Sequence, residues 1–315
     1  MKKYELTDET KEVKTRTLYR IKALIDFGDV KTGDLGGWIE KEENLSQVGQ
    51  CWVYDDACVY NNARISGNAK ICDNAKIFGK AWITDDANVT GIACVFGNAH
   101  VFSNACVYDA AYVYDNAKIF GNACVFGNAC VHDDAYVYDN AQIFSNACIY
   151  DDAYVYDNAK IFGNACVFGN ACVFGNACVH GNAIICETML VSYSRIDTDL
   201  RTDIAASLRG QCNLLLIKNK VIAYKIVNRN LTSLYDKNFI YKIGEIAEVE
   251  DPDESNKSCT SGLHFSNLTY WDNSVQEYKC KTYLIAEINA EDIITIQQGK
   301  IRCRKAKILD KIDIE

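Results

Sequence analysis

The sequence lacks the features that would place it in a membrane or outside a cell. Its 315 residues contain no apolar run approaching the ~18 residues of a membrane-spanning helix. They do not begin with a charged-then-apolar segment of the secretory kind. We therefore expect a cytoplasmic protein that makes no contact with a membrane.

Basic charge and the common cofactor motifs are also scarce. The 33 Lys and Arg residues face 42 Asp and Glu residues, and the net charge of −9 argues against direct nucleic-acid binding. There is no phosphate-binding loop, dinucleotide-binding fingerprint or metalloprotease motif. No Cys-x-x-Cys pair occurs among the 16 cysteines, which argues against a zinc site. These absences predict a protein without a cofactor.

What the sequence does contain is a hexapeptide repeat from residue 51 to residue 186. Every sixth residue from Ala57 to Ala183 is Ala, and Val or Ile stands two residues after each. The unit reads (Val/Ile)-(Tyr/Phe)-(Asp/Gly)-Asn-Ala-x, in which Ala to Tyr/Phe forms a short strand and Asp/Gly-Asn a turn. Three units close a triangular coil, so residues 18 apart become neighbours. This pattern predicts a mainly β protein built on a parallel β-helix.

The cysteines of the repeat mostly fill the outward x position, as Cys130, Cys148 and Cys166 do on successive coils. Equivalent residues of adjacent coils keep their Cβ atoms ~4.8 Å apart, whereas a disulfide prefers ~3.8 Å. We therefore interpret these cysteines as small residues that suit a strand, without a redox or metal role.

The ends of the repeat predict the domain boundaries. Residues 1–36, which include an expected strand at 15–27, would form an N-terminal cap over the open core of the β-helix at 37–192. Residues 193–218 would supply a connector and a capping helix that begins at Asp197/Thr198.

Residues 219–315 would form a separate α+β domain, because the hexapeptide period is absent there. We expect a hairpin over 214–227, strands at 239–243, 283–288 and 301–309, and a helix that carries Leu268, Trp271, Val275 and Tyr278 on one face.

Four N-terminal segments resemble the signature of YdcK-like proteins of bacteria and phages: DFGDVK (26–31), GGWIE (36–40), NLS (44–46) and CWVYD (51–55). That family is similar to the hexapeptide-repeat acyltransferases, so the resemblance implies a left-handed β-helix. The segments YKIG (241–244) and GLHF (262–265), together with Cys259, resemble uncharacterised domains that follow β-solenoids in phage proteins. This second resemblance implies a phage or prophage setting and therefore the host cytoplasm.

Four histidines are the candidates for catalysis. His100 fills an x position, whereas His132 and His180 replace outward aromatic residues, and the three do not share a face. Because the hexapeptides run without an insertion, no loop is available to cover a substrate. In the C-terminal domain His264 has Cys259 and serines nearby, which could supply a nucleophile. We favour a structural role for all four and keep His264 as the catalytic candidate.

Outward aromatic residues form the first candidate binding surface, because contiguous apolar faces are uncommon on a free monomer. Alternatively, the stacked rings only favour strand pairing. Shorter ladders run from Phe78 to Tyr114 and from Tyr108 to Phe162, and the longest comprises Phe102, Phe120, Tyr138, Tyr156 and Phe174.

A second candidate binding surface is acidic. Asp115, Asp133 and Asp151 stack on one corner, with Asp134 and Asp152 beside them. We hypothesise that this acidic ridge binds a cation such as calcium, with Asp133 and Asp151 as ligands, or a basic protein surface. Alternatively, these residues serve only as turn formers.

Together these features predict a non-catalytic binding or assembly protein, in which a rigid β-helix displays a C-terminal recognition domain. The partner would be a protein, and the phage resemblance suggests a host factor that is bound or inhibited. An acyl-CoA-dependent acyltransferase and an enzyme centred on His264 remain the alternatives.

The apolar faces also predict a homo-oligomer, most simply a parallel trimer, because a triangular coil offers flat sides. Light scattering should then give three times the 35.2 kDa mass of the chain. A mass of one chain at high protein concentration would contradict this prediction.

Overall fold

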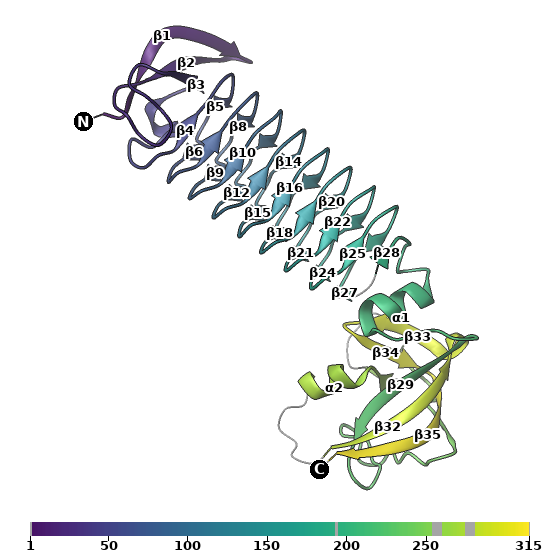
Figure 1. The fold of residues 1–315 in the computed structure, drawn as a ribbon. Helices are drawn as coiled ribbons and strands as arrows, with labels where there is room; N and C mark the ends of the chain where they lie inside the picture. The colour runs from purple at the N-terminus through teal and green to yellow at the C-terminus, as the bar shows by residue number, and fades with distance from the viewer. Residues whose placement is uncertain (1, 193–194, 254–259, 275–280, 315) are drawn as a thin grey trace. The chain divides into compact units, whose positions relative to one another are not determined.

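The computed structural model describes residues 2–192, 195–253, 260–274 and 281–314 (Figure 1). The chain forms two compact units, Met1–Glu187 and Thr188–Glu315. Within the described residues, no helix combines the length and apolar character that crossing a membrane requires.

An antiparallel hairpin begins the first unit. Strand β1 (Tyr4–Val13) pairs with β2 (Arg16–Ala23), which pairs in turn with β3 (Leu35–Ile39). The 3-10 helix η1 (Glu42–Asn44) follows. Because β3 pairs in parallel with the β-helix strand β5 (Cys58–Val59), the hairpin extends one sheet of the solenoid and covers its end. The strand expected at 15–27 ends earlier, at Ala23, because the chain then turns to begin the approach to β3.

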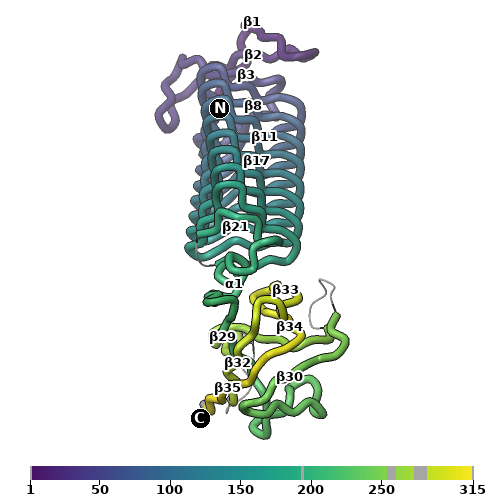
Figure 2. Tube along the Cα trace, turned by 90° about the vertical axis from the view of Figure 1, so that its right-hand side faces the viewer, coloured from purple at the N-terminus to yellow at the C-terminus, as the bar shows by residue number. Residues whose placement is uncertain are grey.

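The β-helix consists of three parallel sheets of two-residue strands, whose stacked coils are visible in Figure 2. The first sheet continues from β3 through β5 (Cys58–Val59), β8 (Lys76–Ile77), β11 (Cys94–Val95), β14 (Tyr112–Val113), β17 (Cys130–Val131), β20 (Cys148–Ile149), β23 (Cys166–Val167) and β26 (Ile184–Ile185). The second contains β4 (Trp52–Val53), β7 (Lys70–Ile71), β10 (Asn88–Val89), β13 (Cys106–Val107), β16 (Cys124–Val125), β19 (Gln142–Ile143), β22 (Lys160–Ile161) and β25 (Cys178–Val179). The third contains β6 (Arg64–Ile65), β9 (Trp82–Ile83), β12 (His100–Val101), β15 (Lys118–Ile119), β18 (Tyr136–Val137), β21 (Tyr154–Val155) and β24 (Cys172–Val173).

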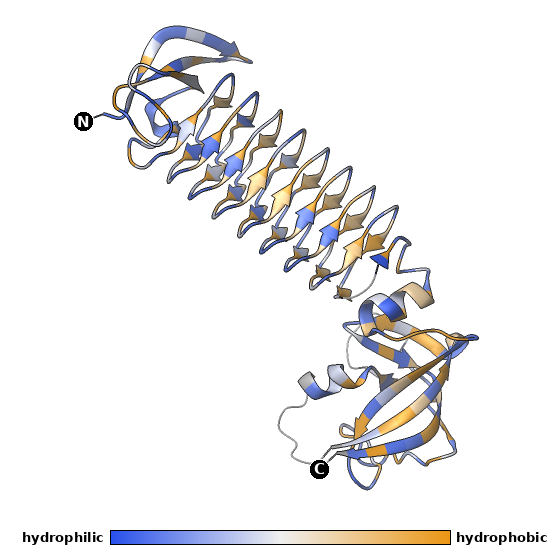
Figure 3. Cartoon of the chain, viewed as in Figure 1, coloured by the Kyte–Doolittle hydropathy of each residue, from blue (hydrophilic) through white to orange (hydrophobic). Residues whose placement is uncertain are grey.

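Neighbouring strands are paired in register at a spacing of 18 residues, as in Cys130↔Cys148 and Val131↔Ile149. The Ala and Val/Ile positions of the repeat point inward, and Ala129 and Val131 are both 0% exposed. Alternation of apolar and polar residues along the coils is visible in Figure 3. The β-helix predicted from the hexapeptide repeat is therefore confirmed.

Each corner of the coil depends on a residue with left-handed backbone angles. Gly97 has a φ of 70° and Asp115, the equivalent residue one coil later, a φ of 53°. A Cβ on Gly97 would lie 2.6 Å from the backbone N of Asp115, so the backbones approach closely there. Gly and Asp are therefore the natural occupants of this position, because both tolerate positive φ.

Aspartates at the corners also bond the next coil. The Asp157 carboxylate accepts a hydrogen bond from the backbone N–H of Gly175 at 3.0 Å, and Asp151 accepts one from Gly169 at 3.1 Å. Beside them the asparagine amides form ladders, for example from Asn122 to Asn140 at 3.1 Å. These bonds give a structural reason for Asp at the corners, without excluding the binding role hypothesised for the acidic ridge.

The second unit begins with β27 (Leu190–Val191), β28 (Arg195–Ile196) and α1 (Ile204–Cys212). The Asp203 carboxylate caps α1 by accepting a hydrogen bond from Ala206 N at 2.8 Å. The helix start predicted at Asp197/Thr198 is therefore wrong. The reason is local, because Asp199 instead accepts bonds from the backbone and side chain of Arg201 and holds a turn there.

Two antiparallel sheets make up the rest of this unit. The larger has the order β29 (Lys220–Val227), β32 (Lys281–Asn289), β35 (Lys305–Ile314) and β30 (Ile246–Glu248). The smaller has the order β31 (Leu263–Phe265), β34 (Lys300–Cys303) and β33 (Ile293–Gln297). Helix α2 (Leu268–Ser274) follows β31, and the 3-10 helix η2 (Ala290–Asp292) follows β32.

Several local predictions for this unit need correction. Of the hairpin expected over 214–227, only the turn closed by the antiparallel bridge Ile217↔Lys220 forms, and β29 pairs along its length with the distant β32. Segment 239–243 is no strand and makes only the bridge Thr232↔Ile240, although its Tyr241 is buried in the core. The strand expected at 301–309 is divided between β34 and β35, whereas 283–288 lies within β32 as predicted. Helix α2 contains Leu268 and Trp271, and Val275 and Tyr278 lie outside the described residues.

One pair of substitutions separates the structural role of the corner aspartates from simple surface charge. Replacing Asp157 with Ala removes an acceptor and leaves a poor residue at positive φ, so the free energy of unfolding should fall by about 1–2 kcal/mol. Asp157→Asn keeps an acceptor and the tolerance for positive φ, and should stay close to the native value. Urea denaturation followed by circular dichroism measures both.

The exposed Asp152 serves as the matched control, since its side chain makes no hydrogen bond to the described residues. Asp152→Ala should change stability by less than about 0.5 kcal/mol. Equal losses for Asp152→Ala and Asp157→Ala would contradict the structural role.

Candidate functional site

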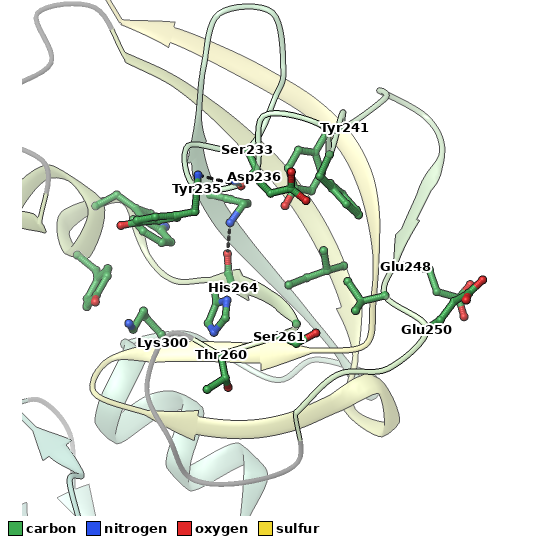
Figure 4. Close-up of a pocket in the computed structure, with 17 residues that line it drawn as sticks. Ser233, Tyr235, Asp236, Tyr241, Glu248, Glu250, Thr260, Ser261, His264 and Lys300 are labelled. Carbon is green, nitrogen blue, oxygen red and sulfur yellow. Dashed lines mark hydrogen bonds between the residues drawn. The ribbon is translucent and has the colours of Figure 1, made fainter.

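A pocket of about 620 Å³ lies in the second unit. Figure 4 shows His264 and Lys300 on one side of it, and Ser233 and Tyr241 on the opposite side. Strands β29, β31 and β34 and helix α2 contribute Lys225, His264, Lys300 and Trp271 to its wall. The pocket is within the usual size of small-molecule and anchor-residue sites, roughly 300–1,000 Å³.

Lys225 is part of this wall and is only 6% exposed. Its Nζ donates a hydrogen bond to the carbonyl oxygen of His264 at 3.2 Å. Three aromatic rings surround the amine, with centroids 5.8 Å away for Tyr241, 5.9 Å for Phe265 and 5.8 Å for Trp271. Burial lowers the pKa of Lys225 to about 8, so the amine is still mostly protonated at neutral pH. The rings partly compensate its lost hydration through cation–π attraction.

Strand β31 and helix α2 are fixed against β29 by backbone bonds. Tyr224 and Ser266 exchange two backbone hydrogen bonds, at 2.7 and 2.8 Å. The indole N–H of Trp271 donates to the Tyr224 carbonyl at 2.7 Å. These contacts fix strand β31 and helix α2 against β29, and so hold His264 and Trp271 in the same wall as Lys225.

His264 lies in the pocket, but its surroundings do not favour acid–base catalysis. Burial, together with the charges of Lys225, Lys300 and Arg302, lowers the pKa of His264 to about 4. The imidazole is therefore neutral at neutral pH and a weak base. No hydroxyl or carboxylate of the described residues hydrogen-bonds to its ring.

The serines near His264 are engaged elsewhere. The Ser261 hydroxyl donates to the carbonyl oxygen of Asp251 at 2.9 Å, and the Ser266 hydroxyl donates to that of Gly299. Cys259, the other predicted neighbour of His264, lies outside the described residues. The hydroxyls of Ser261 and Ser266 are therefore held by backbone carbonyls and do not hydrogen-bond to the His264 ring.

The rim of the pocket is aromatic and carries acidic groups. Tyr235 is 85% exposed, which leaves its ring available to a ligand. Asp236, Glu248 and Glu250 also line the pocket, and Glu248 pairs with Lys305 at 2.8 Å. The site therefore presents aromatic surface with charges of both signs, as a pocket that recognises a polar, partly aromatic group would.

Lys225 was not predicted from the sequence, although a signal was present. In the β29 sequence KVIAYKIV, Lys225 shares the alternation of Val221 and Ala223, which are buried. A lysine on the buried side of a strand requires a specific environment. The alternation in β29 therefore indicates a lysine on the buried side of the strand.

The aromatic ladders of the β-helix are stacked as predicted. In the longest, successive rings from Phe102 to Phe174 lie nearly parallel with centroids 4.8–5.1 Å apart. His132 stacks between Tyr114 and Tyr150, and His180 stacks on Phe162, so both replace aromatic residues. His100 contacts Trp82 edge-on at 5.5 Å. Stacking buries only the faces of the rings. The role of the ladders in binding remains a prediction.

Comparison with known proteins yields two similarities. Residues 221–315 match the family described as a domain of unknown function (DUF7666), so the pocket lies within the matched region. The chain is also 39% identical over 67 residues to the protein named uncharacterized acetyltransferase YdcK from Escherichia coli (strain K12). This match covers 19% of the chain and 21% of that relative. It agrees with the resemblance of the repeat to hexapeptide-repeat proteins.

The low pKa of Lys225 predicts a pH-dependent stability. The unfolded chain has a lysine pKa of about 10.4, so between about pH 8 and pH 10.4 it binds more protons at this site than the folded chain does. Native stability should therefore rise with pH in that interval relative to Lys225→Met, by up to about 3 kcal/mol. Urea denaturation of both chains at pH 7 and pH 10 measures this difference.

Lys300→Met is the matched control, because Lys300 lines the same pocket. It should leave the pH dependence of stability close to that of the native chain. A difference between the native chain and Lys225→Met that does not change with pH would contradict the prediction.

Proposed function

We propose that this protein is a non-catalytic binding protein, in which the β-helix is a scaffold and the C-terminal pocket recognises a protein partner. The observation that carries the proposal is the character of the pocket. It has aromatic walls and a buried amine, whereas His264 is neutral and the serine hydroxyls beside it bond to backbone carbonyls. Such a site supplies contact area and charge for recognition, and neither Ser261 nor Ser266 is placed as a nucleophile for His264.

The regularity of the β-helix supports the scaffold role. Its three sheets contain only two-residue strands from β4 to β26, and consecutive strands are separated by the same short corner throughout. A hexapeptide-repeat acyltransferase requires a histidine at a cleft and a covering loop. His132 and His180 instead stack within aromatic ladders. The similarity to the acetyltransferase therefore supports a hexapeptide-repeat β-helix, and we treat transferase activity as the less favoured alternative.

The pocket favours a partner segment with an aromatic or aliphatic anchor and a carboxylate. The carboxylate would approach the Lys225 and Lys300 side of the pocket, and the anchor would contact Tyr235 and Trp271. The acidic residues at the rim then favour basic groups beside the anchor. A segment of mixed charge with one large apolar side chain fits all of these features.

The test is affinity capture from a bacterial lysate with the full-length chain, followed by mass spectrometry. The native chain should enrich a defined protein, and Tyr235→Ala and Lys300→Glu should each reduce its recovery at least about tenfold, a typical effect of removing an anchor contact. Because Tyr235 is 85% exposed, its truncation does not disturb the core. Tyr112→Ala on the β-helix, where the ring is 46% exposed, is the matched control and should retain the partner.

Three outcomes would overturn the proposal. A partner retained equally by Tyr235→Ala and Lys300→Glu would place recognition elsewhere. Turnover of acetyl-CoA that is lost in His100→Ala, His132→Ala or His180→Ala would establish the acyltransferase alternative. A reaction abolished by His264→Ala, with the fold intact, would establish a C-terminal enzyme.

A further inference from the structure

Three potential metal ligands converge on one face of the β-helix. Cys130 and Cys148 are paired in register in β17 and β20, and His132 follows Cys130 by two residues. The two Sγ atoms and a ring nitrogen of His132 all lie within 4.8 Å of one another. His132 Nε2 is 3.6 Å from Cys148 Sγ. The three side chains are half-buried.

The His132 ring is held in the orientation that a metal ligand needs. Its faces stack on Tyr114 at 4.7 Å and Tyr150 at 5.2 Å, so the ring cannot rotate freely. Its Nδ1 lies 2.9 Å from Oδ2 of Asp133. A carboxylate at Nδ1 favours the tautomer in which Nε2 carries a free lone pair, as in the carboxylate–histidine pairs of zinc sites.

The Asp133 carboxylate lies closer to the imidazole than to the next coil. Its Oδ2 is 2.9 Å from His132 Nδ1 and 3.5 Å from the backbone N of Asp151, at the limit of a hydrogen bond. Asp139 makes a similarly long contact of 3.4 Å to the backbone N of Asp157, so the contact with the imidazole is what distinguishes Asp133.

The distances suit tetrahedral coordination. Typical bond lengths of ~2.3 Å for Zn–S and ~2.0–2.1 Å for Zn–N separate the two ligand atoms by about 3.6 Å at a tetrahedral angle. The observed separation of His132 Nε2 and Cys148 Sγ is also 3.6 Å.

We propose that Cys130, Cys148 and His132 bind a zinc-like divalent cation, with Asp133 as the positioning residue and the fourth coordination place open to water. Thiolate and imidazole ligands select a borderline-soft ion over calcium or magnesium. The oxygen-rich set Asp115, His132 and Asp133 also lies within 4.8 Å, but Asp115 is exposed. The missing Cys-x-x-Cys motif does not argue against this site, because the coil brings together cysteines 18 residues apart.

The repeat supplies matched controls. Cys106 and Cys124 are a second in-register pair, on β13 and β16. The stacked rings beside them belong to Tyr108 and Phe126, so this pair has no imidazole in the position of His132. His180 likewise stacks on a ladder, on Phe162 at 5.1 Å, and supplies a control for loss of a histidine.

The experiment is a cobalt(II) titration of the full-length, reduced chain without oxygen. The native chain should bind one equivalent with the visible absorption of tetrahedral Co(II) and a thiolate charge-transfer band, both removed by zinc. His132→Phe keeps a ring in the ladder and should lose the spectrum, as should Cys130→Ser/Cys148→Ser. Asp133→Asn should weaken binding about 10–100-fold. Cys106→Ser/Cys124→Ser and His180→Phe should bind as the native chain does.

Melting curves of the metal-free chains establish that each variant is folded before titration. Unchanged cobalt binding in folded His132→Phe or Cys130→Ser/Cys148→Ser would overturn the proposal. Equal loss in Cys106→Ser/Cys124→Ser would overturn it too, because it would indicate unspecific binding to stacked thiols. Binding of Mn²⁺ that survives the cysteine substitutions would assign the ion to the Asp115 set instead.

Discussion

The hydrogen bonds between successive coils are the interaction on which the first unit depends. The first residue of a strand donates its backbone N–H to a carbonyl one coil further along, as Cys130 does to Ala147 and Tyr136 to Ala153, both at 2.9 Å. Because the register never shifts, each side chain lies directly over its equivalent in the previous coil. The side chains of the β-helix are therefore arranged in columns. Each column contains residue types that can lie directly over one another.

Stacking like upon like has different consequences for different side chains. Aromatic rings gain from it, since their faces bury one another at 4.7–5.2 Å. Asparagine amides gain as well, because each can donate to the next, as Asn146 does to Asn164. Aspartates would repel one another, but a carboxylate such as that of Asp157 is held by a backbone N–H of the following coil. Columns of mixed content, such as Lys76, Cys94 and Tyr112, avoid repulsion by alternation.

The same columns explain how much of the fold was predictable. The β-helix is specified by local repetition, so the period of the alanines predicts its strands, corners and ladders. The second unit depends on pairings between distant segments, such as β29 with β32, which no local pattern announces. In segment 239–243 Tyr241 is buried in the core whereas Ile240 and Ile243 are exposed, so the apolar composition alone predicted a strand that does not form. The start of α1 was missed because Asp197, Asp199 and Asp203 are equally good caps by sequence.

Site residues were predictable to the extent that they belong to one column. The ladder residues are found by counting 18 along the sequence, and His132 is recognised as a ring among rings. His132 and Cys148 belong to two adjacent columns, so counting 18 residues along the sequence does not reveal that they are close. Lys225 and His264 come together through the pairing of Tyr224 with Ser266. That contact depends on the fold of the whole unit.

The columns also determine which changes of length the β-helix can accept. Duplication of 18 residues would insert one coil, lengthen the solenoid by ~4.8 Å, and return every later residue to its own face. Duplication of a single hexapeptide would instead move every later column to the neighbouring face. An extra hexapeptide between Cys130 and Cys148 would separate the two thiols. It would also interrupt, next to Tyr138, the aromatic ladder that runs from Phe102 to Phe174. Growth of such a protein in evolution is therefore expected to proceed by whole coils, although its repeating unit is a third as long.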